Sequence, residues 1–143
     1  MVVSKKHKLY VGCALTESPE KFKDGIDKLK SALRSEGYEV FDFVGLVDGT
    51  PKDVYEWDVN LCIKNCDAFI AICDYPGIGL GFELGEAKNL KKPILALAQN
   101  DSRVTRLVLG LAEVEPNAQF ERYGDIGTDV VPLVNKWLSQ FIA

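Results

Sequence analysis

The stretch AFIAICDYPGIGLGFELGEA, residues 68–87, decides the fold class of this chain. Its first part, Ala68 to Cys73, has almost no polar residue, and a short continuous apolar run of this kind predicts a strand buried on both faces. A glycine-rich turn is expected at 74–81, and a helix follows to about Leu90, before Lys92-Pro93. A buried strand that leads into a helix is the repeating unit of a parallel sheet.

The same alternation extends in both directions from this unit. Towards the N-terminus the pattern predicts a strand at 9–15, followed by a helix that has Ser18 as its cap and Pro19 as its first residue and that ends at Gly37. A second strand is predicted at 38–44 and a loop at 45–49. A helix capped by Thr50 then runs to about Asn65. Towards the C-terminus it predicts a strand at 94–98, a helix at 104–111, a weaker strand at 119–123 and a closing helix at 128–141.

These elements predict a single α/β domain, 1–143, with a doubly wound, mostly parallel sheet of about five strands, of flavodoxin-like or Rossmann-like type. In such sheets ligands bind beyond the carboxyl ends of the strands. The turns after Leu15, Val44, Cys73 and Ala98 are therefore expected to surround the site.

Composition excludes several classes of protein. The net charge is −4 and no basic stripe is present, so neither nucleic acid nor an anionic membrane is an expected partner. No apolar run approaches the roughly 20 residues that span a bilayer, and MVVSKKHK lacks a signal-peptide core, which predicts a cytoplasmic protein. The cysteines lack the second pair or the neighbouring histidine of a zinc site, so we expect buried thiols and no metal; they are Cys13, Cys62, Cys66 and Cys73.

Glu83 is the first candidate for chemistry. The glycines at 77, 79 and 81 let the backbone approach a ligand, and the helix start that follows offers free N–H groups and a positive dipole end. Glu83 is expected in that first turn, ionised, as a nucleophile or charge partner. The alternative is a solvated glutamate that merely favours the dipole. A Rossmann fingerprint would follow the first strand rather than the third, and no Gly-Lys-Ser/Thr completes a Walker A loop.

Asp58 and Tyr10 are the other candidates. Asp58 shares a helical stripe with Val54, Leu61 and Asn65, and an acid on an apolar face is costly unless it is paired or used. We therefore expect Asp58 and Glu83 to face one pocket. The alternative is a rotated helix that buries Val54, Trp57 and Leu61 and leaves Asp58 at the rim. Tyr10 lies in the first strand, where a tyrosine is more often a core residue than a catalytic one.

The motifs LYVGCAL, VYEWDVNLCIKNCDAFIAICD, PGIGLGFELGEA and KPILAL together resemble the nucleoside 2-deoxyribosyltransferase family. This family also contains the 2'-deoxynucleoside 5'-phosphate N-hydrolases, and the similarity covers Lys8 to Leu109. The resemblance implies a compact doubly wound sheet and a homo-oligomer, a homodimer or larger, with sites at subunit contacts. It also implies that neither a metal nor an organic cofactor is needed.

Position by position, the resemblance implies three catalytic residues. Glu83 matches the family nucleophile, Asp58 the helix carboxylate that handles the base and its proton, and Tyr10 a strand tyrosine near the nucleophile. The substrate-binding residues that it implies are Gly12, Cys13, Gly77, Gly79, Gly81 and Thr105, the last contributed by a neighbouring subunit. The mixed apolar and basic segment 104–111 is then expected at the subunit contact.

The expected reaction is cleavage of a 2'-deoxyribonucleoside through a deoxyribosyl-Glu83 intermediate, with transfer to another nucleobase in nucleoside salvage. The alternatives are a 5'-monophosphate N-hydrolase and a nucleotide-binding module without turnover. Gly77 stands where similar transferases carry Asp and similar hydrolases carry Ser. The first loop, 14–17, carries an acid and no cation, which favours a nucleoside over a nucleotide. Arg103 and Arg106 weaken this argument for a nucleoside, since either residue of a neighbouring subunit could reach a phosphate.

Overall fold

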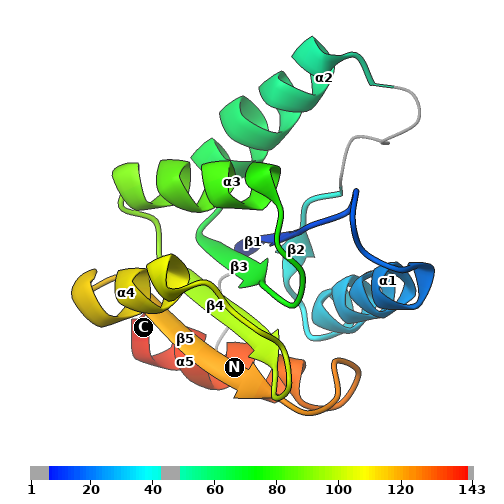
Figure 1. Ribbon diagram of the computed structural model, residues 1–143, viewed down its shortest axis with the longest axis vertical. Coiled ribbons are helices and arrows are strands. Elements are labelled where there is room, and N and C mark those ends of the chain that lie inside the picture. Colours follow the sequence, from blue (N-terminus) through cyan, green and yellow to red (C-terminus); the bar gives the residue numbers. More distant parts are fainter. Residues whose placement is uncertain (1–6, 43–48, 142–143) are drawn as a thin grey trace, which may run out of the picture.

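The computed structural model describes residues 7–42 and 49–141, and in them the chain folds around one five-stranded sheet (Figure 1). All strand pairings are parallel and the order is β2-β1-β3-β4-β5. This is the flavodoxin-like order, so the predicted doubly wound sheet is confirmed. The strands are β1 (Lys8–Cys13), β2 (Glu39–Val40), β3 (Ala68–Ile72), β4 (Ile94–Gln99) and β5 (Ala118–Tyr123).

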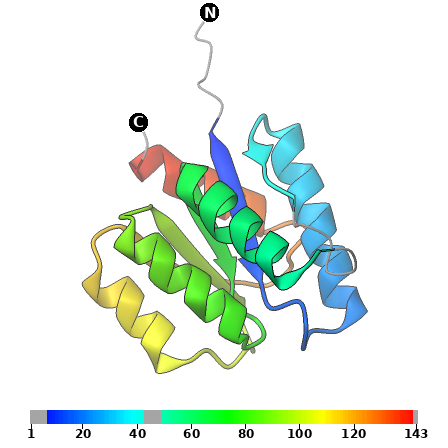
Figure 2. The ribbon, with the colours of Figure 1, turned by 90° about the horizontal axis from the view of Figure 1, so that it is seen from above.

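Helices cover both faces of the sheet, as Figures 1 and 2 show. They are α1 (Glu20–Ser35), α2 (Pro51–Tyr55), the π-helix η1 (Glu56–Ile63), α3 (Ile78–Asn89), α4 (Arg106–Val114) and α5 (Val130–Phe141). Leu9 and Val11 of β1 pack with α1 and α5, whereas Tyr10 packs on the opposite face with residues of η1 and α3. The alternation along β1 therefore directs Tyr10 to the layer that contains the candidate acids.

Two predicted boundaries near the N-terminus change. Helix α1 begins at Glu20, and Pro19, in an extended conformation, is its N-cap. Ser18 does not cap it, because its hydroxyl donates instead to the carbonyl of Leu15. The helix ends as predicted before Gly37, whose φ of +101° favours glycine. The predicted strand at 38–44 pairs only over Glu39–Val40, and its end, with most of the following loop, lies outside the described residues.

The helix predicted from Thr50 to Asn65 is present but changes type along its length. Thr50 and Asp53 form a capping box at its start. From Glu56 to Ile63 it becomes a π-helix, in which hydrogen bonds run from residue i to i+5 and residues four apart no longer share a face. The predicted stripe is therefore wrong beyond Asp58, because Leu61 and Asn65 are exposed. The alternative, a rotated helix that buries Val54, Trp57 and Leu61, is also wrong at Leu61, because this side chain is exposed.

Helix α3 begins earlier than the glycines predict. Gly77 is its N-cap and Gly81 lies inside it, so the turn expected at 74–81 ends four residues sooner. A helical glycine costs about 1 kcal/mol relative to alanine, while burying a leucine contributes about 1.5–3 kcal/mol. Leu80 and Leu84 are both 5% exposed, and their burial against the sheet outweighs the glycine cost. This shift moves Glu83 into the second turn of the helix.

The remaining elements follow the prediction apart from small shifts at their ends. All four cysteines are buried and free, as expected. Among residues 7–42 and 49–141, no helix combines the length and the apolar character that crossing a bilayer requires.

Candidate active site

A cavity of about 770 Å³ opens beyond the carboxyl ends of β1, β3 and β4. Its volume falls in the range of sites for small molecules. Both Asp58 and Glu83 line it, as expected. A second cavity of about 430 Å³, between α2–η1 and α3, shares these two residues with the first. The two carboxyl groups therefore stand where the cavities meet, and a ligand that extends from one cavity to the other would pass them.

Glu83 is held by a hydrogen bond from the neighbouring layer. Its side chain is 8% exposed, and the hydroxyl of Tyr10 donates to its Oε2 at 2.5 Å. Tyr10 is fully buried and stacks on Phe69 with the ring centroids 5.5 Å apart. Burial, together with the negative charge of Glu83, raises the pKa of the Tyr10 hydroxyl. Tyr10 thus stays protonated and acts as a fixed donor that orients the carboxylate.

Burial also changes the charge state of Glu83. The pKa of this carboxyl group is raised to about 7, mainly by burial; the hydrogen bond from Tyr10 opposes the rise and the nearby Asp58 adds to it. The expectation that the helix start keeps Glu83 ionised is wrong, because Glu83 lies one turn beyond the free N–H groups and desolvation dominates. Near neutral pH both the ionised and the protonated form of Glu83 are populated.

Asp58 is half-buried on η1. Burial raises its pKa, while the hydroxyl of Tyr10 and the ammonium group of Lys30 oppose that shift. Two carboxyl groups with raised pKa values in one apolar site can divide the tasks of nucleophile and proton donor between them. Among the residues that the structure describes, no group of three or more His, Cys, Asp or Glu is arranged to hold a metal ion.

Gly12 and Cys13 lie directly beside this group. A Cβ atom at Gly12 would come within 2.6 Å of the Phe69 ring and 3.5 Å of Oε1 of Glu83, so any side chain here would displace the stacked ring. Cys13 lines the first cavity. Burial raises the pKa of its thiol to about 12, which keeps it protonated and unsuited to nucleophilic attack.

The glycines of the turn have unequal roles. Gly77, Gly79 and Gly81 all line the first cavity. A Cβ atom at Gly77 would lie 2.8 Å from Cβ of Ala14, whereas at Gly79 and Gly81 it would meet nothing within 4 Å. The φ of Gly77 is −162°, extended backbone that any residue adopts. Ala14, which the sequence did not single out, is therefore what makes glycine necessary at 77.

The loop after β4 contributes Arg103 and Thr105 to the first cavity of its own chain. Thr105 also caps α4, its hydroxyl accepting from the backbone N–H of Leu107. Arg122 donates to three carbonyl oxygens of this loop, those of Gln99, Asn100 and Ser102. Arg103 is the one cationic side chain among the described residues that line this cavity. The sequence anticipated such a cation only from a neighbouring subunit.

Besides Ala14, the sequence interpretation missed Lys30. It is 4% exposed on the inner face of α1, where Ile26 and Leu33 stand one turn away on either side. That spacing is the signal that could have found it, since a lysine among apolar residues at helical period is directed inward. Burial lowers the pKa of its ammonium group, while carboxylates nearby oppose that change.

Comparison with known proteins adds sequence relatives and structural neighbours, although no family model matches the chain. The sequence is 30% identical over 110 residues to a Thermofilum pendens protein named "Putative 2'-deoxynucleoside 5'-phosphate N-hydrolase 1", covering 71% of this chain and 75% of that protein. A Methanosarcina barkeri protein with the same name is 36% identical over 61 residues, which is 43% of this chain and 38% of the relative.

Solved structures share the fold at lower identity. A CMP N-glycosidase from Clostridium botulinum superposes with a TM-score of 0.72 at 24% identity, covering 92% of this chain and 99% of that one. A 2-deoxyribosyltransferase from Leishmania mexicana gives a TM-score of 0.63 at 18% identity, with 96% and 99% covered. A third neighbour, a 2-deoxyribosyltransferase from Bacillus psychrosaccharolyticus, gives 0.59 at 21% identity, with 83% and 87% covered.

The buried carboxyl group of Glu83 predicts an unusual stability profile. Because its pKa is about 7 when folded and 4.5 without burial, the folded state loses stability as pH rises through this interval. Glu83→Gln removes the buried charge and keeps an acceptor for Tyr10. Urea unfolding should therefore find the variant more stable than wild type at pH 8, by at most about 3 kcal/mol, with the difference vanishing near pH 4. A variant that is less stable at pH 8 would show that the ionised form stabilises the fold.

The contact between Ala14 and Gly77 predicts a second result. Gly77→Ser should lower the free energy of unfolding by about 1–3 kcal/mol, because the added atoms meet the Ala14 methyl group. Gly79→Ser, where the added Cβ meets nothing, is the matched control and should be neutral or stabilising. Ala14→Gly combined with Gly77→Ser should recover stability relative to Gly77→Ser alone. Additive effects in this double-mutant cycle would mean that the two residues do not interact.

Proposed function

Because this chain belongs to the nucleoside 2-deoxyribosyltransferase family, we propose that it cleaves the N-glycosidic bond of 2'-deoxynucleoside 5'-monophosphates, with Glu83 as nucleophile and water as final acceptor. The observation that carries the proposal is that Asp58 and Glu83 line one cavity while the buried Tyr10 holds Glu83 by a hydrogen bond. A binding module without turnover has no need for two desolvated carboxyl groups, since burying them costs stability.

The first half-reaction releases the base. An ionised Glu83 oxygen attacks the anomeric carbon, and the bond from that carbon to the base nitrogen breaks as the sugar passes through an oxocarbenium-like transition state. The bonding electrons leave with the base, which takes a proton from Asp58. Burial raises the pKa of Asp58, which favours the protonated form that this step requires. The products are the free base and a 5-phospho-2-deoxyribosyl ester of Glu83.

The second half-reaction restores the enzyme. Asp58, now ionised, accepts a proton from water as the water oxygen bonds to the anomeric carbon and the ester bond to Glu83 breaks. Two inversions at one carbon give net retention of configuration. Tyr10 gives up its proton in neither step, since its pKa is raised, and it keeps the Glu83 oxygen aligned throughout.

The choice of a 5'-monophosphate rests on Arg103 and on the relatives. Arg103 lines the cavity that Glu83 faces and can pair with a phosphate. The sequence relatives are named as 5'-phosphate N-hydrolases. The second candidate is deoxyribosyl transfer to another base, which the sequence alone favours. The loop after β1 supports that candidate. Its residues Ala14 to Glu17 line the cavity without a cation, and Glu17 would repel a phosphate.

A second copy of the chain is part of this proposal. Helices α3 and α4 carry large apolar side chains that the single chain leaves in water: Ile78 is 95% exposed, Leu107 82%, Val114 76% and Phe82 53%. Such residues on the helices next to the site support a homo-oligomer whose contact includes the predicted segment 104–111.

Removal of the nucleophile provides the direct test. Glu83→Ala should lower release of base by a thousandfold or more, because it removes the nucleophile and leaves Asp58, which the proposal assigns to proton transfer. The four common 2'-deoxynucleoside 5'-monophosphates and their nucleosides are incubated with and without a second free base, and the products are separated by chromatography. Mass spectrometry of quenched wild type should find an adduct on the peptide that contains Glu83: a phosphodeoxyribosyl group from a 5'-monophosphate, or a deoxyribosyl group from a nucleoside. A new nucleoside or nucleotide would select transfer over hydrolysis, and no base from any substrate would refute the proposal.

Light scattering tests the second copy. Wild type at micromolar concentration should have at least twice the mass of one chain, and Leu107→Glu should shift it towards the monomer, since a charge would be buried at the contact. Gln140→Glu, an exposed change on α5, is the control and should leave the mass unchanged. A monomeric wild type would contradict the assignment of this surface.

A further inference from the structure

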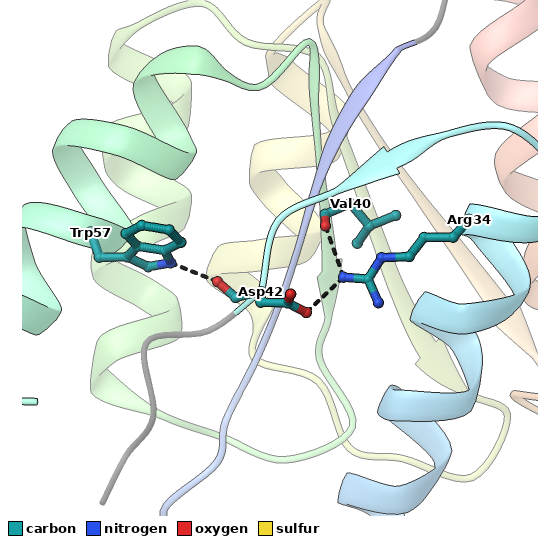
Figure 3. A network of polar contacts seen from close by, with 4 residues as sticks. All are labelled: Arg34, Val40, Asp42 and Trp57. Atoms are coloured by element: carbon teal, nitrogen blue, oxygen red, sulfur yellow. Dashed lines mark hydrogen bonds and ion pairs between the residues drawn. The ribbon is translucent and has the colours of Figure 1, made fainter. Parts of the chain in front are cut away.

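A set of polar contacts links α1, the end of the β2 segment and η1 (Figure 3). The indole N–H of Trp57 donates to the backbone carbonyl of Asp42 at 2.6 Å. The carboxylate of Asp42 accepts from Nη2 of Arg34 at 2.6 Å, and the same nitrogen donates to the carbonyl of Val40 at 2.9 Å. Arg34 thus fixes Asp42, and Asp42 fixes Trp57.

Trp57 directly precedes Asp58 on the π-helix. The part of the helical segment before this point is poorly anchored, because α2 has no buried residue and projects away from the sheet in Figure 1. The buried residues of η1 all follow Asp58, and they are Val59, Cys62 and Ile63. On the N-terminal side of Asp58 the hydrogen bond of Trp57 is therefore a polar tether that adds to the packing of its ring against the core and to the ring contact of Tyr55 with Phe82.

The helix type makes such a tether important. A π-helix holds one more residue in its hydrogen-bonded turn than an α-helix does, so a return to α geometry would rotate every residue before the change. Asp58 would then turn away from Glu83. We propose that Arg34, Asp42 and Trp57 are positioning residues that keep Asp58 aligned with Glu83, an inference that rests on the proposed function.

The expected effect is on rate rather than on folding. The pair between Arg34 and Asp42 is exposed, with side-chain exposures of 40% and 73%, and exposed ion pairs contribute little to stability. A displacement of about 1 Å in a catalytic group can cost on the order of a hundredfold in rate. Loss of this tether should therefore lower kcat strongly while it leaves the unfolding midpoint almost unchanged.

The experiment compares Trp57→Phe, which keeps a ring but loses the N–H donor, with Arg34→Ala, a surface change that leaves Trp57 intact. Kinetics are measured on whichever common 2'-deoxynucleoside 5'-monophosphate or nucleoside wild type cleaves best. We expect kcat to fall at least tenfold in Trp57→Phe and by a smaller factor in Arg34→Ala, with KM within about twofold of wild type. Lys88→Ala, which breaks the exposed ion pair with Glu115, is the matched control and should leave kcat unchanged.

A double-mutant cycle separates positioning of Asp58 from a general structural effect. In an Asp58→Asn background, Trp57→Phe should cause almost no further loss, because the group that it positions is already disabled. Equal losses in both backgrounds, or unchanged kcat in both tether variants, would overturn the inference while the proposed function stands. A wild type that cleaves no substrate would overturn both.

Discussion

The hydrogen bond from Tyr10 to Glu83 fixes β1 to α3, and much of the site follows from it. A carboxyl group that is 8% exposed must have a partner, and a strand tyrosine that is fully buried provides one that cannot move. Gly12 leaves the space that the Phe69 ring needs to stack on Tyr10, and the leucines of α3 hold the helix against the sheet. The carboxylate of Glu83 is thus positioned by the core, and its raised pKa is a result of the same burial.

The two acids depend on different parts of the molecule. Glu83 projects from a helix whose inner face is packed on the sheet, so its position is as stable as the core. Asp58 projects from a segment whose first five residues bury nothing, and it relies on neighbouring contacts at the edge of the sheet. Regions with few buried contacts open at lower free energy than the core. Asp58 is consequently the less firmly held of the two acids.

The sequence predicted the sheet well because buried parallel strands are short apolar runs, as Ala68 to Cys73 illustrates. It also singled out Tyr10, Asp58 and Glu83, which the structure places together. It misplaced the start of α3, because local glycine content suggested a turn and tertiary burial of leucines decided otherwise. It could not anticipate the π-helix, since a 3.6-residue period was assumed. Ala14 was missed because its importance arises from a contact with Gly77, distant in sequence, whereas Lys30 was missed although its helical spacing with Ile26 and Leu33 indicated burial.

The contact between Ala14 and Gly77 restricts the order in which this protein could change during evolution. A side chain at 77 that could touch a substrate first requires space, and Ala14 occupies that space. A path that begins with a substitution at 77 passes through a strained intermediate, whereas a path that begins with glycine at 14 does not. The two positions should therefore behave epistatically, with position 14 acting as the permissive site. A change of specificity at this wall of the cavity therefore depends on an earlier change at Ala14, a residue that contributes only a methyl group.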